Sequence, residues 1–322
     1  MEISVVDQSP IFTNTNADQA IRDSVELAQY SDQIGLKRFW LAEHHGSSSF
    51  AGCSPEILIP RIASSTKNIR VGSGGVMLMH YSPYKVAENF RLLESMFPRR
   101  IDLGLGRAPG SDPFQAGALA YGSKTTGPEF FPTKMNDLRS FLSNQTSETK
   151  SFENVNVTPG LGDVPDTWLL VSSEQGADYA SFFGLPMSLA YFINQDCLHL
   201  AKPYRENFQK SIFGDNPQVS VAVFAICAET NEEANLLASS ASIWRENVSK
   251  GIFGPFPTLE EATKKIKDKE EGKSIVGDKK YVEGQLMKIL EETNADELKI
   301  ITICESMSSK KESYRLIKEI FS

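Results

Sequence analysis

The stretch "KRFWLAEHHGSSSFAGCSPEILIPRIASSTKNIRVGSGGVML" (residues 37–78) contains one full unit of a pattern that recurs along the chain. A β-rich run at 37–43 comes first. A segment of helical period at 54–66 follows, which Ser54 and Pro55 open as cap and first turn, and a second β-rich run at 69–78 closes the unit. The order strand, helix, strand is typical of an α/β protein with a parallel sheet.

The same alternation continues on both sides of this stretch. We expect strands at 3–9, 37–43, 69–78, 100–106, 167–173, 186–193, 218–229 and 296–305. We expect helices at 17–35, 54–66, 82–97, 132–143, 174–184, 198–213, 231–247 and 310–321. Eight strand–helix units without a break in composition predict a (β/α)8 TIM barrel, formed by residues 1–322 as a single domain. A doubly wound sheet remains the alternative, because strand order cannot be read from one sequence.

Three connections, at about 107–131, 144–166 and 250–277, are longer than ordinary loops and rich in Gly, Pro, Ser and Thr. In a barrel, long loop insertions at the C-terminal face shape a pocket or a lid. We therefore expect these segments to supply residues that line a substrate pocket.

The bulk composition argues against several classes of function. The formal charge is −8 and no run of Lys and Arg forms a basic stripe, so we expect no nucleic-acid partner. No apolar stretch reaches the roughly eighteen residues that span a bilayer, and the first ten residues read as a strand rather than a signal peptide. The four cysteines are far apart and show no CxxC spacing. These features predict a cytoplasmic protein with no membrane partner.

Polar residues and glycines gather where the expected strands end. The set comprises Asp7, Gln8, Glu43, His44, His45, Gly72 to Gly75, His80, Arg107, Ser172 and Ser173. The carboxyl ends of barrel strands meet at one mouth, and barrel active sites lie there. We therefore expect these residues to converge on a single site.

Glu43, His44 and His45 end the second strand and include two of the four histidines of the chain. A metal site needs three or more ligands, and adjacent strand residues point to opposite faces. Asp7 and His80 could add ligands, but no HxH or HxxxH spacing is present. The pattern therefore favours a site without metal, in which a histidine acts near neutral pH as acid, base or hydrogen-bond donor.

Two segments could bind a phosphate. "GLGRAPG" (104–110) lacks strict GxGxxG spacing, so Arg107 could offer its planar fork to a phosphate or form a structural ion pair. "VSSEQGA" (171–177) begins a helix, where free N–H groups attract anions. Alternatively, Ser172 could simply cap that helix, with Gln175 three residues on. Glu174 is an unfavourable charge beside a phosphate.

The strand "VGSGGVML" (71–78) is unusually rich in glycine for a buried strand. Glycine offers no side chain for packing, so the run indicates either a close approach of backbone or ligand, or a β-bulge. A flat ring could lie against Gly74 and Gly75.

The stretch 38–110 contains the EHH, glycine-rich and GLGRAPG motifs, and it closely resembles the luciferase-like flavin monooxygenases, relatives of bacterial luciferase. "SSEQGADYASFFGLPMSLAYFI" (172–193) resembles their second signature, and 275–302 resembles their C-terminal unit. The resemblance covers nearly the whole chain and is specific to the family, not to one substrate. It implies a (β/α)8 barrel that binds FMN at the C-terminal mouth, usually as a homodimer packed through early helices.

The resemblance also implies a cofactor site. Gly74 and Gly75 match a pair joined by a cis peptide bond beneath the isoalloxazine ring of the flavin. The positions that match phosphate-binding residues are Arg107, Ser172 and Ser173. Relatives often carry Ser or Thr where this chain has Gly176, so one hydroxyl toward the phosphate is missing.

His44 matches the histidine that is thought to act as the catalytic base of the family. His45 and His80 are then expected in the substrate pocket as hydrogen-bond donors. In the implied reaction, a separate flavin reductase supplies reduced FMN. The reduced FMN reacts with O2 to give a C4a-(hydro)peroxyflavin, which oxidises a small organic substrate. The protein would supply orientation, a dry pocket and proton handling.

Three alternatives to the monooxygenase remain. They are an F420-dependent oxidoreductase on the same scaffold, a non-catalytic flavin-binding protein, and a metal-dependent barrel hydrolase. The intact His44 favours an enzyme, and the missing ligand spacing counts against the hydrolase.

Overall fold

The computed structural model describes residues 1–108, 111–143, 145–147, 149–160, 162–265 and 274–322. The strands in this part of the chain are β1 (Glu2–Asp7), β2 (Arg38–Leu41), β3 (Arg70–Met77), β4 (Ile101–Gly106), β5 (Asp166–Val171), β6 (Met187–Ala190), β7 (Val219–Ala228), β8 (Ile275–Asp278) and β9 (Glu297–Ile301). The α-helices are α1 (Ala17–Gln33), α2 (Pro55–Ala63), α3 (Pro83–Met96), α4 (Pro113–Ala120), α5 (Phe131–Ser143), α6 (Glu174–Phe183), α7 (Ala201–Asn207), α8 (Asn231–Ser249), α9 (Leu259–Thr263), α10 (Lys279–Thr293) and α11 (Met307–Ile320). None of these helices has the length and apolar character needed to cross a bilayer.

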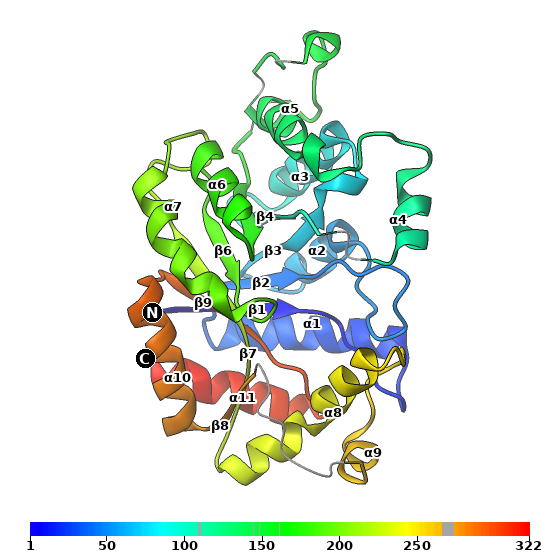
Figure 1. The fold of residues 1–322 in the computed structure, drawn as a ribbon, viewed down its shortest axis with the longest axis vertical. Helices are drawn as coiled ribbons and strands as arrows, with labels where there is room; N and C mark the ends of the chain where they lie inside the picture. Colours follow the sequence, from blue (N-terminus) through cyan, green and yellow to red (C-terminus); the bar gives the residue numbers. More distant parts are fainter. Residues whose placement is uncertain (109–110, 144, 148, 161, 266–273) are drawn as a thin grey trace.

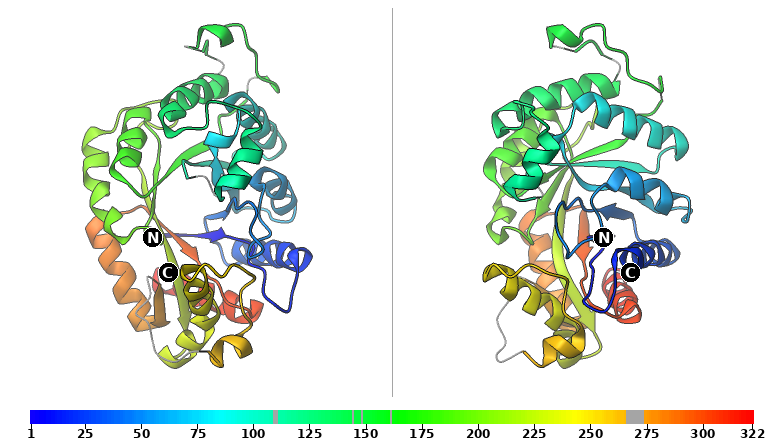
Figure 2. Two further views of the ribbon diagram at one scale, coloured as in Figure 1. Left: turned by 45° about the vertical axis from the view of Figure 1, so that its right-hand side comes forward. Right: turned by 90° about the vertical axis from the view of Figure 1, so that its right-hand side faces the viewer.

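Eight of the strands close into a parallel barrel. Neighbouring strands follow the order β1, β2, β3, β4, β5, β6, β7, β9, and β9 pairs again with β1. The pairing of β6 with β7 closes the ring, which excludes the doubly wound sheet because such a sheet has two free edges. Helices surround the strands, as Figure 1 and the turned views in Figure 2 show. The prediction of a (β/α)8 barrel is therefore confirmed.

Side chains that alternate along the strands belong to two different apolar clusters. In β1, Ile3 and Val5 belong to the large apolar cluster between strands and helices, whereas Val6 belongs to a second cluster with Trp40 and Trp168. Successive strand residues point to opposite faces, so the second cluster fills the inside of the barrel. Aromatic side chains therefore occupy much of the interior.

The barrel interior also contains a charged network. The Arg38 guanidinium donates to both oxygens of Asp102, at 2.8 and 2.9 Å, and its Nε donates to Glu297 at 3.0 Å. The ammonium of Lys299 lies 3.5 Å from Glu297 and 4.0 Å from the ring centres of Trp40 and Trp168. Asp102 on β4 is buried, and so are Glu297 and Lys299 on β9. Each charge is thus offset by an opposite charge or an aromatic face.

The chain between β7 and β9 differs from the prediction. We expected the helix at 231–247 to complete the seventh unit, but that role belongs to α10, which packs its buried Val282, Leu286 and Ile289 into the outer core. The sequence reading also missed β8, which pairs with the second half of β7 beyond the barrel. Helix α8 is therefore an insertion between β7 and β8.

Helix α8 reaches the carboxyl ends of the barrel strands. Its Trp244 stacks on Phe256, with 4.6 Å between the ring centres, and makes an edge contact with Phe50, which follows β2. Trp244 Nε1 also donates to the hydroxyl of Ser49 at 3.0 Å. The helix thus forms part of a roof above the barrel interior.

Two further expectations need correction. The helix expected at 198–213 is shorter: a 3-10 turn at Gln195–Leu200 leads into α7, which ends at Asn207. The segment 144–166 joins the end of α5 to the start of β5, so it does not leave the carboxyl end of a strand. The segment 107–131 does leave the carboxyl end of a strand, because it follows β4. It is therefore an insertion at the C-terminal face, as expected.

The charge of Lys299 makes stability depend on pH. Burial lowers the pKa of Lys299 from its ordinary value near 10.5 to about 8, so the unfolded chain binds more protons between these values. The free energy of unfolding should therefore rise with pH in this window, by at most about 1.4 kcal/mol per pH unit. Urea unfolding of the wild type and Lys299→Met at pH 7, 8.5 and 9.5 measures the effect. The difference, wild type minus variant, should grow with pH, and a constant difference would contradict the buried charge.

Candidate active site

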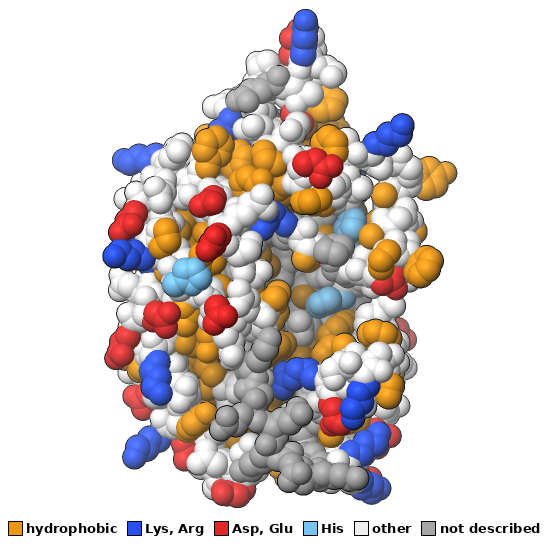
Figure 3. Space-filling model, viewed as in Figure 1, with side chains coloured by type: hydrophobic (Ala, Val, Ile, Leu, Met, Phe, Trp, Pro, Cys, Tyr) orange, Lys and Arg blue, Asp and Glu red, His pale blue; other side chains and the backbone are white. Residues whose placement is uncertain are grey.

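Most of the residues expected at the strand ends lie after the carboxyl ends of parallel strands. Glu43, His44 and His45 follow β2, and His80 ends a 3-10 turn (Leu78–His80) after β3. Arg107 follows β4, while Ser172 and Ser173 follow β5. Figure 3 shows histidine and basic side chains bordering a hollow near the middle of one face of the molecule. We call this end of the barrel the mouth.

Arg107 and the start of α6 form a cluster of hydrogen-bond donors. Arg107 Nη2 donates to Ser173 Oγ at 2.9 Å, and Nη1 donates to Gln175 Oε1 at 2.7 Å. The guanidinium also lies over the rings of Phe131 and Tyr179, at 5.8 and 5.4 Å. No carboxylate neutralises it among the described residues, and partial burial lowers its pKa. Its charge is therefore held in place by neutral groups, which leaves it able to bind an anion. Residues 109 and 110 of the GLGRAPG motif lie outside the described residues.

The helix α6 is capped by Ser173, not by Ser172 as the capping alternative assumed. Ser173 Oγ accepts from the N–H of Gly176, and the carbonyl of Ser172 accepts from the side chain of Asn194. A Cβ at Gly176 would lie 3.1 Å from Val171 and 3.4 Å from Arg107 Nη2. A larger residue there would crowd the guanidinium, so the glycine fits the position of Arg107. Glu174 is exposed and points its charge into solvent.

Gly74 and Gly75 are joined by a cis peptide bond in β3. The pairing with β4 shifts register between Gly74 and Val76, so the β-bulge that the sequence left open is present. A Cβ on Gly75 would lie 2.7 Å from the carbonyl oxygen of Gly104. The close approach of β3 and β4 therefore accounts for glycine at this position.

His44 lies in an apolar setting. Its ring stacks on Phe50, with 4.3 Å between the ring centres, and its Nδ1 is buried without a hydrogen-bond partner among the described residues. Burial, with a smaller effect of the charge on His45, lowers the pKa of His44 to about 4. The imidazole is therefore neutral at pH 7, and one of its ring nitrogens makes no hydrogen bond in the described part of the chain.

Glu43 organises the other side of the same turn. One of its oxygens lies 2.7 Å from His45 Nε2 and accepts from the Tyr81 hydroxyl, also at 2.7 Å. The other oxygen accepts from the backbone N–H of Met77 at 3.1 Å. Burial and the charge of Glu43 raise the pKa of Tyr81. Glu43 therefore orients His45 and the Tyr81 hydroxyl.

His44 and His45 have different ring partners, because His44 stacks on Phe50. His45 instead faces His80, with 6.2 Å between the ring centres. In the described part of the chain, no three side chains of His, Cys, Asp or Glu are arranged to hold a metal ion.

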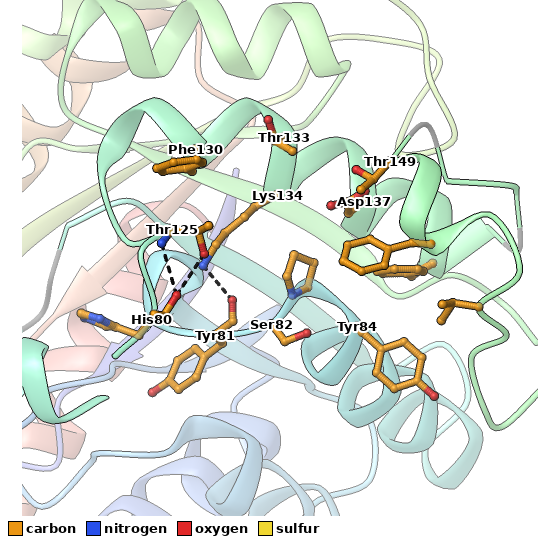
Figure 4. A pocket seen from close by; sticks show the side chains of 15 residues that line it. His80, Tyr81, Ser82, Tyr84, Thr125, Phe130, Thr133, Lys134, Asp137 and Thr149 are labelled. Atoms are coloured by element: carbon orange, nitrogen blue, oxygen red, sulfur yellow. Dashed lines mark hydrogen bonds between the residues drawn. The ribbon is translucent and has the colours of Figure 1, made fainter. Parts of the chain in front are cut away.

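A cavity of about 740 Å³ lies beside the mouth, between α5 and the chain that follows β3 (Figure 4). Its lining residues are His80, Tyr81, Ser82, Pro83, Tyr84, Ser123, Thr125, Phe130, Thr133, Lys134, Asp137, Phe141, Thr149, Phe152 and Val155. Two of the long segments, 107–131 and 144–166, supply residues that line this cavity, and its use as the substrate pocket stays a prediction. Of the predicted site residues, only His80 lines this cavity.

Several residues near the site were not found by sequence reasoning. Lys134 donates to the backbone carbonyls of Met79 and Tyr81, at 2.8 and 2.9 Å, and so fixes the turn that carries His80. Tyr81 adjoins His80 in the sequence, which was the one available signal for it. Asp7, expected at the mouth, instead accepts from the side chains of Ser9 and Ser24.

The chain is similar in sequence and structure to several known proteins. The family model described as luciferase-like monooxygenase matches residues 1–290. The N-acetyl-S-alkylcysteine monooxygenase of Bacillus subtilis (strain 168) is 37% identical over 235 residues, which cover 73% of this chain and 70% of that protein.

Two solved structures have the same fold. The crystal structure of apo-MsnO8 is 33% identical, with a TM-score of 0.91, and covers 99% of this chain and 98% of its own. The oxygenating constituent of 3,6-diketocamphane monooxygenase from Pseudomonas putida, in complex with FMN, has a TM-score of 0.73 at 18% identity. That match covers 98% of this chain and 96% of its own and supports the fold alone. By the family model and the close relatives, the chain belongs to the luciferase-like monooxygenase family, whose members are oxidoreductases.

Proposed function

We propose that the chain is a flavin-dependent monooxygenase that uses reduced FMN and O2 to oxidise a small organic substrate. This proposal is supported by an arginine with neutral hydrogen-bond partners and a neutral histidine, which follow strands of the barrel at one mouth. The arginine is Arg107, which follows β4 and donates to Ser173 after β5, and the histidine is His44, which follows β2. A separate flavin reductase supplies the reduced cofactor in this proposal.

The residues present fit a flavin mononucleotide. Its phosphate would be held by the Arg107 guanidinium, the hydroxyls of Ser172 and Ser173, and the N-terminus of α6, whose free N–H groups favour an anion. A side chain at Gly176 would lie beside the Arg107 guanidinium. The glycine therefore leaves room for Arg107 to bind the phosphate in place of the missing hydroxyl. The orphaned Nδ1 of His44 offers a polar contact inside the mouth.

When bound, reduced FMN would supply the activation of O2, which protein side chains alone do not provide. The chain itself would do three things. Arg107 and Ser173 anchor the cofactor by its phosphate, and the backbone at Gly74 and Gly75 offers a surface free of side chains to a flat ring. His44 accepts or returns a proton at its free nitrogen, because it is neutral at pH 7.

Aromatic side chains above the barrel would keep the reaction dry. Phe50, Trp244 and Phe256 contact one another, with ring centres 4.6 to 5.6 Å apart, and Phe50 stacks on His44. Excluding water strengthens hydrogen bonds inside the site and prevents loss of reactive species to solvent. His45 and His80, on the Glu43 side, are proposed as donors to the substrate.

A homodimer is proposed from exposed apolar side chains on two neighbouring helices. Ile57 on α2 is 68% exposed, and Leu92 and Met96 on α3 are 53% and 52% exposed. Large apolar side chains on adjoining helices are typical of a subunit interface.

Replacing Arg107 tests whether this residue binds the phosphate of FMN and not the rest of the cofactor. In Arg107→Gln we expect FMN to bind about 10- to 100-fold more weakly, because a charge-assisted hydrogen bond contributes roughly 1.5–3 kcal/mol. Riboflavin, which lacks the phosphate, should bind the variant and the wild type alike. Fluorescence titration with both flavins, and with F420, gives the affinities.

Arg22→Gln, at an exposed arginine of α1, is the matched control and should leave both affinities unchanged. Equal losses for FMN and riboflavin in Arg107→Gln would show that Arg107 does not hold the phosphate. A wild type that bound F420 and no FMN would refute the proposed cofactor.

His44→Asn should test the proton-handling role. We expect FMN affinity to stay within about twofold, while reoxidation of bound reduced FMN in air-saturated buffer changes at least about tenfold in rate. Because the pKa of His44 is about 4, its imidazole stays neutral from pH 5.5 to 8, and the wild-type rate should show no ionisation of this group in that range. Stopped-flow absorbance measures both properties. An ionisation near pH 6.5 that disappears in His44→Asn would contradict the neutral state, and loss of FMN binding alone would contradict the role.

A further inference from the structure

Arg245 on α8 is a half-buried cation that has no polar partner in the part of the chain that the structure describes. Its guanidinium lies over the ring of Phe224, with 5.5 Å between Cζ and the ring centre. Among the described residues it makes no hydrogen bond and no ion pair, and burial lowers its pKa. By contrast, four other arginines that are buried or half-buried donate hydrogen bonds to oxygen atoms of the protein. They are Arg38, Arg70, Arg100 and Arg107.

The location of Arg245 follows from Phe224. Ser220, four residues earlier in β7, contacts Lys299 inside the barrel, so Phe224 points to the same interior face. Phe224 makes an edge contact with Phe192, which follows β6, at 5.3 Å between ring centres. Arg245 thus covers an aromatic wall on the β6–β7 side of the barrel.

This wall belongs to the same mouth as His44. Trp244, the neighbour of Arg245 on α8, contacts Phe50, which stacks on His44. Phe50, Trp244 and Phe224 all pack against the interior cluster of the barrel. Arg245 therefore approaches the mouth from β7, whereas Arg107 approaches it from β4, with β5 and β6 between them.

The two arginines differ in the anion that they suit. Arg107 is joined by hydroxyls and by a helix N-terminus, which together match the several oxygens of a phosphate. Arg245 presents only its planar fork against aromatic rings. A fork of this kind binds a carboxylate through two parallel hydrogen bonds, and the rings accept an apolar body beside it.

A guanidinium on an apolar wall loses hydration, and the face of Phe224 offsets only part of that loss. A bound anion offsets the rest. We propose that Arg245 binds the carboxylate of the substrate, so that the molecule oxidised at this mouth is an organic acid whose apolar part lies against Phe192 and Phe224. This inference rests on the proposed monooxygenase function and names its substrate class.

The test compares two probes of the same carbon skeleton, 4-phenylbutanoate and 4-phenylbutanamide. The first carries a charged carboxylate, and the second carries an uncharged amide in its place. Their affinities for the full-length protein are measured by isothermal titration calorimetry and by quenching of tryptophan fluorescence, with and without FMN. The wild type should bind the carboxylate at least about tenfold more tightly than the amide, because a charged hydrogen bond is replaced by a neutral one. In Arg245→Gln the preference should fall below about twofold, and in Arg245→Lys it should be intermediate.

Arg22→Gln is again the control and should keep the full preference. FMN affinity should stay within about twofold in Arg245→Gln, which also shows that the variant is folded. The proposal is wrong if the wild type shows no preference for the carboxylate, including the case in which it binds neither probe. It is also wrong if Arg245→Gln weakens FMN binding tenfold, because Arg245 would then hold the cofactor phosphate. A wild type that prefers the carboxylate but binds no FMN would refute the proposed function and leave Arg245 only as a carboxylate-binding residue.

Discussion

The side chain of Arg38 ties four strands together inside the barrel. From β2 it reaches Asp102 on β4, Asp166 on β5 and Glu297 on β9. Taking these charges out of water is costly, and their attraction offsets the cost only when every partner is in place. Removing one partner of such a buried set typically costs about 3–5 kcal/mol, because an uncompensated charge remains. The network therefore favours the one strand arrangement in which the ring is closed.

The interior charges and the mouth occupy opposite ends of the same strands. Arg38, Asp102 and Glu297 lie near the starts of β2, β4 and β9, whereas His44 and Arg107 follow the ends of β2 and β4. Trp40 and Trp168 lie between the two levels and contact Lys299 with their rings. The lower half therefore provides a rigid base beneath the residues at the mouth.

Much of the barrel could be predicted from sequence because each strand is short, β-rich and bounded by a helix of regular period. The convergence of Glu43, His45, Arg107 and Ser173 at one end also followed, since parallel strands share one carboxyl end. The inserted role of α8 could not be predicted, because its helical pattern looks like that of any barrel helix. The α10 segment did carry a signal, a capping Asp278 followed by Val282, Leu286 and Ile289. Tyr81 and Arg245 depend on contacts between distant segments, which leave no local pattern.

The insertion of α8 also bears on how such a chain can diverge. The excursion leaves β7 at Ala228 and returns at Ile275, and the strands that bound it are paired, Ala228 with Asp278 and Ala225 with Ile275. Because the two ends lie side by side, the excursion can change in length or composition without moving the barrel strands. Arg107 and Ser173, which follow β4 and β5, belong to a different part of the chain. A descendant could therefore exchange its roof, and with it the molecules it accepts, while inheriting the rest unaltered.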